Sequence, residues 1–126
     1  MHVRTANADE IPAVMNVLDG AVLSIAVETV RAGAEDGGTL VAVSGDDETD
    51  GRVLGALVLD DTHIEAVAVR RRRRGQGIGT ALVEAALDRR DCVTAEFDAD
   101  VRPFYEALGF AIEPLEEPDR YRGVRE

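Results

Sequence analysis

The sequence predicts an α/β protein in which one twisted mixed sheet carries helices on both faces. Apolar residues recur at helical spacing in some segments and alternate, or run continuously, in others. The two kinds of segment interleave along the chain, as they do in α/β folds. The chain has 126 residues, 45% of them hydrophobic, which is enough for one buried core. We therefore expect a single domain spanning residues 1–126.

The N-terminal third is predicted to form a strand and then helices. Residues 2–6 are typical of a short strand. A helix follows, capped either by Asn7, which has a glutamate at capping-box spacing, or by Asp9. Pro12 favours the later start, because proline is tolerated only in the first turn of a helix. A second helical stretch, residues 22–34, ends before a pair of glycines.

The middle of the chain is predicted to form an antiparallel meander. Three strand-like segments cover residues 39–44, 52–59 and 62–69. The polar segment 45–51 connects the first two as a hairpin loop, and the aspartates at 60–61 form the next turn.

The C-terminal part returns to alternating elements. A helix is expected over about residues 78–90, a strand over 92–97 and a short helix over 101–108. A further strand begins at 110–112, and the tail, 118–125, supplies a last one. The predicted order is β-α-α-β-β-β-α-β-α-β(β).

The charge balance is strongly acidic, with 25 acidic and 14 basic residues and a net charge of −11. All 14 basic residues are arginines, and the sequence contains no lysine. Such a field repels nucleic acids and anionic membranes, so we expect neither as a partner. Salt screens the self-repulsion of an acidic chain. The composition therefore favours a halophilic source over an ordinary acidic protein.

Other features of the composition favour the cytoplasm. No apolar run approaches the roughly 20 residues that a transmembrane helix needs, and the N-terminal residues lack the apolar region of a secretion signal. The lone Cys92 cannot form an internal disulfide, which fits a reducing compartment. His2 and His63 do not stand at metal-ligand spacing from the carboxylates, so no metal is expected.

The segment VAVRRRRRGQGIGTALV, residues 67–83, runs from a strand through a basic, glycine-rich turn into a helix. A helix N-terminus offers unpaired N–H groups to an anion, and glycines let the backbone approach it closely. Gly75, Gly77 and Gly79 have the spacing G-x-G-x-G, one residue short of the dinucleotide fingerprint. The lysine of a Walker motif is missing as well. The segment therefore predicts a phosphate cradle of another kind.

The pattern R/Q-x-x-G-x-G/A, filled by Arg74, Gly77 and Gly79, resembles the coenzyme loop of the GNAT superfamily of acetyl-CoA-dependent N-acetyltransferases. The segment FYEALGF, residues 104–110, is similar to the later motif of that family, and RTANADEIPAV, residues 4–14, to its first strand and helix. The resemblance covers nearly the whole chain. It implies a GNAT fold with two splayed central strands, acetyl-CoA as cosubstrate, and acetyl transfer to a primary amine of a small molecule or peptide, with a homodimer as one arrangement.

The resemblance also implies which residues hold the coenzyme. The strand before the loop would bind the pantetheine arm through its backbone, and the turn would bind the pyrophosphate. The matching positions are Val67, Ala68, Val69, Arg74, Gly75, Gln76, Gly77, Ile78, Gly79 and Thr80. The chain departs from the family at residues 70–73, where many relatives carry an acidic or proline-containing stretch. These arginines suggest extra positive charge near the coenzyme's 3′-phosphate, or a solvated basic turn.

Tyr105 matches the family's tyrosine near the thioester sulfur and is predicted to protonate the departing thiolate. The alternative is that Tyr105 only packs in the core. Neither Ser24 nor Ser44 lies in a hydrolase motif, and Cys92 has no histidine at catalytic spacing. We therefore expect direct attack by the amine without an acyl-enzyme.

A general base must accept the proton of the amine. His63 is the first candidate because its ordinary pKa of about 6.5 suits the task, and Glu65 and Glu96 follow. Residues two apart on a strand share a face, so His63 and Glu65 are expected to lie on the same face as Val67. The alternative is that these are solvated polar residues of a half-exposed strand.

Two other functions remain open from the sequence. One is a non-catalytic, acyl-CoA-binding regulatory module on the same fold. The other is an unrelated module that uses the arginine run on an anionic partner. Gly77, Gly79 and Tyr105 favour acetyl transfer and acyl-CoA binding over this last reading.

Overall fold

One seven-stranded sheet, in the order β1-β2-β3-β4-β5-β7-β6, organises the protein. The computed structural model describes residues 2–20, 27–44, 52–73 and 75–126. The strands are β1 (His2–Thr5), β2 (Thr39–Val43), β3 (Val53–Asp60), β4 (His63–Val69), β5 (Val93–Asp98), β6 (Ala111–Pro114) and β7 (Arg120–Arg125). The helices are α1 (Ile11–Gly20), α2 (Val27–Asp36), α3 (Ile78–Arg89) and α4 (Arg102–Ala107), with short 3-10 turns η1 (Ala8–Glu10), η2 (Arg71–Arg73) and η3 (Ala99–Val101).

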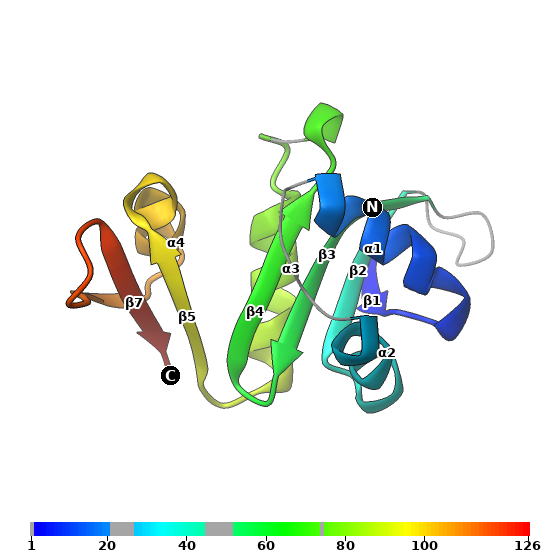
Figure 1. Ribbon diagram of the computed structural model, residues 1–126, viewed down its shortest axis with the longest axis horizontal. Coiled ribbons are helices and arrows are strands. Elements are labelled where there is room, and N and C mark those ends of the chain that lie inside the picture. Colours follow the sequence, from blue (N-terminus) through cyan, green and yellow to red (C-terminus); the bar gives the residue numbers. More distant parts are fainter. Residues whose placement is uncertain (1, 21–26, 45–51, 74) are drawn as a thin grey trace.

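The predicted α/β fold is confirmed, with helices on both faces of a mixed sheet (Figure 1). The meander, the strand after α3 and the last strand all form where they were expected. The predicted hairpin loop at 45–51 and the first part of the predicted helix at 22–34 lie outside the described residues. None of the helices within the described ranges is long and apolar enough to cross a membrane.

The start of the helical region shows why the chain folds there. The Asn7 N–H donates to Glu10 Oε1 at 2.9 Å, which forms one half of the expected capping box. Glu10 also accepts from Arg4 through both carboxylate oxygens, at 2.6 and 2.8 Å. Pro12 is the second residue of α1, where its missing N–H needs no intrahelical partner. The first strand is thereby tied to the helix that follows it.

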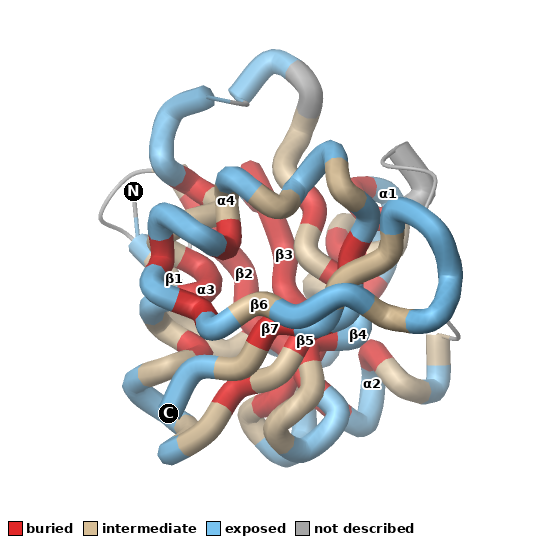
Figure 2. Tube along the Cα trace, turned by 90° about the vertical axis from the view of Figure 1, so that its left-hand side faces the viewer, coloured by how far each residue is buried: buried red, intermediate tan, exposed pale blue. Residues whose placement is uncertain are grey.

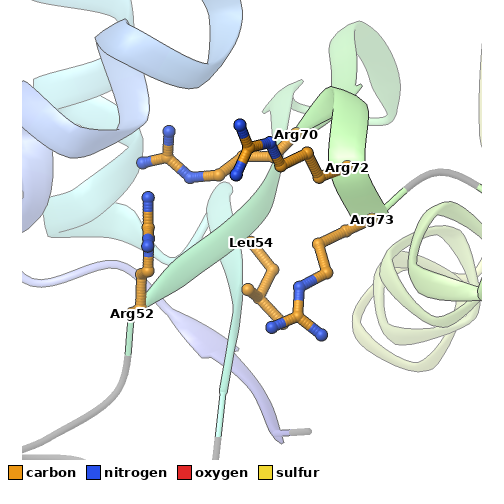
Figure 3. Close-up of a pocket in the computed structure, with 5 residues that line it drawn as sticks. All are labelled: Arg52, Leu54, Arg70, Arg72 and Arg73. Carbon is orange, nitrogen blue, oxygen red and sulfur yellow. The ribbon is translucent and has the colours of Figure 1, made fainter.

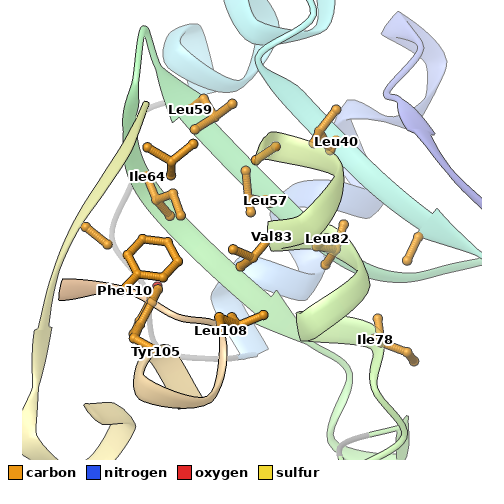
Figure 4. Packing of buried hydrophobic residues seen from close by; sticks show 14 of the residues in the cluster. Leu40, Leu57, Leu59, Ile64, Ile78, Leu82, Val83, Tyr105, Leu108 and Phe110 are labelled. Carbon is orange, nitrogen blue, oxygen red and sulfur yellow. The ribbon is translucent and has the colours of Figure 1, made fainter. Parts of the chain in front are cut away.

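Two apolar layers cover the sheet. One face packs against α1 and α2 through a cluster that includes Val14, Leu18 and Val58. The other face packs against α3 and α4 through a cluster that includes Leu57 and Leu82 (Figure 4). The central strands β2 and β3 are buried almost throughout, as Figure 2 shows.

The two edges of β4 are paired very differently. Toward β3, β4 is paired along its whole length, from Asp60–His63 to Gly55–Val69. Toward β5 the pairing is parallel, as predicted, but joins only His63 to Thr94 and Ile64 to Ala95. Beyond these residues the two strands separate toward the top of Figure 1. The expected splay between the central strands is therefore present.

A β-bulge in β4 corrects one prediction. Val58 is opposite Ala66 while the next residue, Leu59, is opposite Ile64, so Glu65 is the extra residue. Because of the bulge, Ile64 and Val67 both pack on the α3 face, although they are three residues apart. His63 alternates with Ile64 and therefore lies on the opposite face. The expectation that His63 shares a face with Val67 was wrong.

Candidate functional site

A pocket of about 310 Å³ opens where β4 and β5 separate, and we call it the splay pocket. Strands β4, β5 and β7, the η3 turn and the start of α4 contribute to its wall. It is lined by Ile64, Glu65, Ala66, Val67, Glu96, Phe97, Asp98, Val101, Phe104, Tyr105 and Arg120. Three of the four predicted catalytic residues, Glu65, Glu96 and Tyr105, are thus brought together from three elements.

Tyr105 is the buried member of this set, with 6% of its surface exposed. Its ring stacks on Phe97 at a centroid distance of 4.3 Å, and it meets Phe104 and Phe110 edge-on at 5.0 and 5.1 Å. These contacts fix the ring in the pocket wall. Burial raises the pKa of the phenol from 10 to about 12, so the group keeps its proton throughout the physiological range.

The carboxylates of the splay pocket differ in their partners. Asp98 accepts from Arg120 Nη1 at 2.9 Å, and both side chains face solvent. Glu65, in the bulge, and Glu96, on β5, are exposed. His63 is not among the residues that line the pocket, and its Nδ1 lies 2.8 Å from Thr94 Oγ1. The structure therefore brings Glu65 and Glu96, and not His63, to the pocket.

The backbone of β4 faces this gap at alternate residues. The Arg70 N–H donates to the Leu54 carbonyl of β3 at 2.8 Å. Because peptide groups alternate along a strand, those of Ala68 also point to β3, and those of Val67 and Val69 point toward β5. The peptide groups of Ala68 thus face β3 and its side chain is buried, so Ala68 offers no group to the gap. Val67 and Val69, the other two positions predicted to bind the pantetheine arm, do face the gap.

The glycine turn, residues 75–80, forms a second pocket of about 240 Å³. It is lined by Val69, Arg73, Gly75, Gly77, Ile78, Gly79, Thr80 and Phe104. Gly77 is the N-cap of α3, with φ of +80°, and Gly75 has φ of +79°. Both values lie in the region that favours glycine. Of the remaining predicted loop residues, Gln76 is exposed, and Arg74 lies outside the described residues.

The geometry of the turn fits a phosphate group. The N–H groups in the first turn of α3 have no intrahelical acceptor and carry the positive end of the helix dipole. A Cβ built on Gly75 or Gly77 would meet nothing within 4 Å, so the space above both glycines is open. An anion can therefore approach the backbone there.

Phe104 joins the two pockets, because it lines both. Its ring also lies 3.5 Å from a Cβ built on Gly79, so an alanine at 79 would be in van der Waals contact with this shared wall. The sequence analysis did not predict this position of Phe104. Its place beside Tyr105 in the FYEALGF segment was the available signal. Within the described ranges no group of three or more metal-ligating side chains comes together.

Comparison with known proteins agrees with this arrangement. Residues 34–112 match the acetyltransferase (GNAT) domain family. The chain belongs to the GNAT family. The match spans more than half of the chain and includes β4, the glycine turn and Tyr105. No curated protein sequence matches the chain.

Solved structures share the whole GNAT fold. Ard1 from Thermoplasma volcanium has a TM-score of 0.76 at 20% identity, covering 98% of this chain and 95% of that one. Rv2747 from Mycobacterium tuberculosis, solved in complex with CoA and NLQ, has a TM-score of 0.76 at 19% identity and 98% coverage of both chains. A GNAT acetyltransferase from Bacillus cereus has a TM-score of 0.78 at 14% identity, covering 99% and 96%. At such identities the likeness establishes the fold.

Proposed function

We propose that this GNAT protein transfers the acetyl group of acetyl-CoA to a primary amine by direct attack. The observation that carries the proposal is the short β4–β5 pairing, which leaves a pocket containing Tyr105, Glu65 and Glu96. The glycine turn adjoins this pocket through Phe104. Acetyl-CoA supplies an activated thioester, and the chain supplies binding, orientation and proton transfer.

The glycine turn would hold the coenzyme's pyrophosphate. The N–H groups of Gly77 to Thr80 lie at the start of α3, and the positive φ of Gly75 and Gly77 keeps this surface open. The peptide groups of Val67 and Val69 face the gap and would bind the pantetheine arm. Rv2747 carries CoA on the same fold, which supports this assignment.

The Val67 N–H would also stabilise negative charge on the thioester oxygen. It points from β4 toward the side where β5 has diverged, and Val67 lines the splay pocket. A backbone donor fixed by the sheet needs no reorganisation when charge develops during attack. The expected acceptor of the amine proton is Glu65, two residues before Val67 on the same strand. Glu96 faces it from β5 as the alternative base.

Tyr105 would donate its proton to the departing thiolate. A pKa of about 12 keeps the phenol protonated at neutral pH, and the aromatic contacts with Phe97 and Phe104 hold its ring in place. The thiolate would accept this proton as the C–S bond breaks, and the phenolate left behind, which is the stronger base, would regain a proton from solvent. Cys92 is not among the residues that line the splay pocket, which agrees with attack by the amine itself.

Thiol release from acetyl-CoA, measured in molar KCl with a panel of primary amines, tests the proposal. Tyr105→Phe should lower kcat roughly 10- to 1000-fold with little change in acetyl-CoA affinity. Tyr121→Phe is the matched control, since Tyr121 is the other tyrosine and does not line the pocket. Coenzyme binding without turnover for any amine would instead favour the non-catalytic acyl-CoA module.

The base is identified by the pH dependence of kcat/KM. Glu65→Gln should remove most of the activity and flatten the ascending limb, because glutamine cannot accept the proton. Glu96→Gln is the comparison on the facing strand. His63→Gln should keep the limb, since His63 is outside the pocket lining. Loss of the limb only in His63→Gln would reverse this assignment.

A further inference from the structure

A cavity of about 390 Å³ lies where β3 begins and β4 ends, outside the two pockets described above. It is lined by Arg52, Leu54, Arg70, Arg72 and Arg73, and we call it the arginine pocket. Figure 3 shows Arg52 and Arg70 extending toward each other with Arg72 beside them, while Arg73 turns toward Leu54. Three guanidinium groups thus gather on one side of Leu54, and that of Arg73 lies on its other side.

The charge of this pocket is opposite to that of the protein. The chain carries a net charge of −11, yet among the residues that the structure describes no acidic one lines the arginine pocket. The ion pairs recorded within the described ranges use Arg4, Arg102 and Arg120, and none of these lines the pocket. Like charges brought together repel one another, and an anion between them would relieve this repulsion.

The pocket is also partly preorganised. The Arg70 Nε donates to the Val53 carbonyl at 2.6 Å, which fixes the plane of that guanidinium and leaves its terminal nitrogens toward the cavity. Arg70 is half-buried, whereas Arg52, Arg72 and Arg73 are exposed and can adjust around a ligand. Guanidinium forks match the paired oxygens of phosphate and carboxylate groups.

We propose that the arginine pocket binds a small molecule carrying a phosphate group, at a position separate from the coenzyme turn. Four guanidinium groups suit a doubly charged ligand with several acceptor oxygens better than a single carboxylate. A cavity of this size accommodates a small ligand. The acidic surface elsewhere repels an extended polyanion, so a small phosphorylated ligand is favoured over a nucleic acid.

The two anion positions are lined by largely different residues of the segment that links β4 to α3. Val69 packs on the α3 face and lines the glycine turn, and its neighbour Arg70 is directed to the other side by strand alternation. Of the described residues, Arg73 is the one that lines both pockets. A phosphate at Arg52 and Arg70 would therefore leave the first turn of α3 accessible to the coenzyme.

Calorimetric titration of inorganic phosphate at constant ionic strength tests the site, with the protein first saturated with coenzyme A to fill the glycine turn. Arg52→Gln and Arg72→Gln should each raise the dissociation constant roughly tenfold or more, because charge-assisted bonds are lost. Arg52→Lys keeps the charge without the fork and should fall between. Arg89→Gln, on the exposed end of α3, changes the net charge equally and should leave phosphate affinity nearly unchanged.

Measuring both ligands on two variants tests whether the arginine pocket is separate from the coenzyme turn. Gly77→Val should weaken coenzyme A and spare phosphate, and Arg52→Gln should do the opposite. Displacement of phosphate by coenzyme A would overturn the proposal. So would an Arg52→Gln variant that weakens coenzyme A but not its 3′-dephospho form, because the pocket would then hold the coenzyme's own phosphate. If coenzyme A does not bind at all, the proposed function fails, and titration of the free protein still decides the phosphate site.

Discussion

The two edges of β4 perform different tasks. The edge toward β3 is paired from His63 to Val69, and the neighbouring residues of β3, such as Leu57, are buried. The edge toward β5 is paired at only two residues and then borders the splay pocket. One strand therefore divides its peptide groups between pairing with β3 and facing the splay pocket. Substitutions on the β3 side should act on stability, and those on the β5 side on catalysis.

The largest expected effect is on the β3 side. Leu57 is fully buried opposite Val67, so Leu57→Ala should reduce the free energy of unfolding by about 2–5 kcal/mol. Urea denaturation measures the loss, and turnover per folded molecule should stay close to that of the wild type. An unchanged unfolding midpoint, or a large loss of turnover in the folded fraction, would break the division between the two edges.

The stability of the protein at alkaline pH tests whether a residue of the pocket wall also contributes to the fold. Tyr105 is such a residue, because it lines the splay pocket and is buried. Its folded-state pKa of about 12 exceeds the ordinary value of 10, so above pH 10 the unfolded state loses the proton first. Stability should therefore fall between pH 10 and 12, by about 2–3 kcal/mol in all. The chain has no lysine to obscure this range. Tyr105→Phe should remove most of the dependence in melts recorded across pH 9–12, and Tyr121→Phe should retain it.

A smaller effect is expected at the glycine turn, which belongs to the catalytic side. Gly77→Val places a Cβ beside the anion position and a β-branched residue at φ of +80°. Acetyl-CoA affinity should fall at least tenfold, or about 1.4 kcal/mol. Circular dichroism should show the fold retained. Full affinity in a folded variant would remove the turn from the coenzyme site.

The smallest expected effect, counted per charge, is that of salt on stability. Salt should act equally on both edges of β4, because it screens the charge of the whole protein. The net charge of −11 predicts that KCl stabilises the fold by screening self-repulsion. Thermal midpoints in dilute and multi-molar KCl measure this, and sulfate is avoided because it strengthens apolar burial in any protein. A midpoint as high in dilute buffer as in multi-molar KCl would count against a halophilic source.

Much of the fold was predictable because its signals are local. The apolar run of β3, the alternation in β4, the glycines ahead of α3 and the Asn7–Glu10 spacing each act within a few residues. The bulge at Glu65 was not predictable, because a bulge arises from the register of β4 against β3 and no residue type announces it. Because of this bulge, the side chain of His63 lies on the opposite face of the sheet from that of Val67.

The site was predictable to the extent that it is carried by contiguous motifs. The glycine turn and FYEALGF each lie in one segment, and Figure 4 shows Tyr105 and Phe110 packed as that motif suggests. The pairing of Asp98 with Arg120 and the shared wall at Phe104 join elements distant in sequence. Such contacts depend on where β7 and α4 pack and have no local signature.

The narrow junction between β4 and β5 has a consequence for how the protein can evolve. Strands β5, β7 and β6 are paired with one another, and their strand pairing with the rest of the sheet joins only His63 to Thr94 and Ile64 to Ala95. Substitutions at exposed positions of that smaller group, such as Glu96 or Asp98, can reshape the wall of the splay pocket without altering the ladder from β1 to β4. Under the proposed function, acceptor preference would therefore diverge through β5, β7 and β6 while the ladder from β1 to β4 stays unchanged.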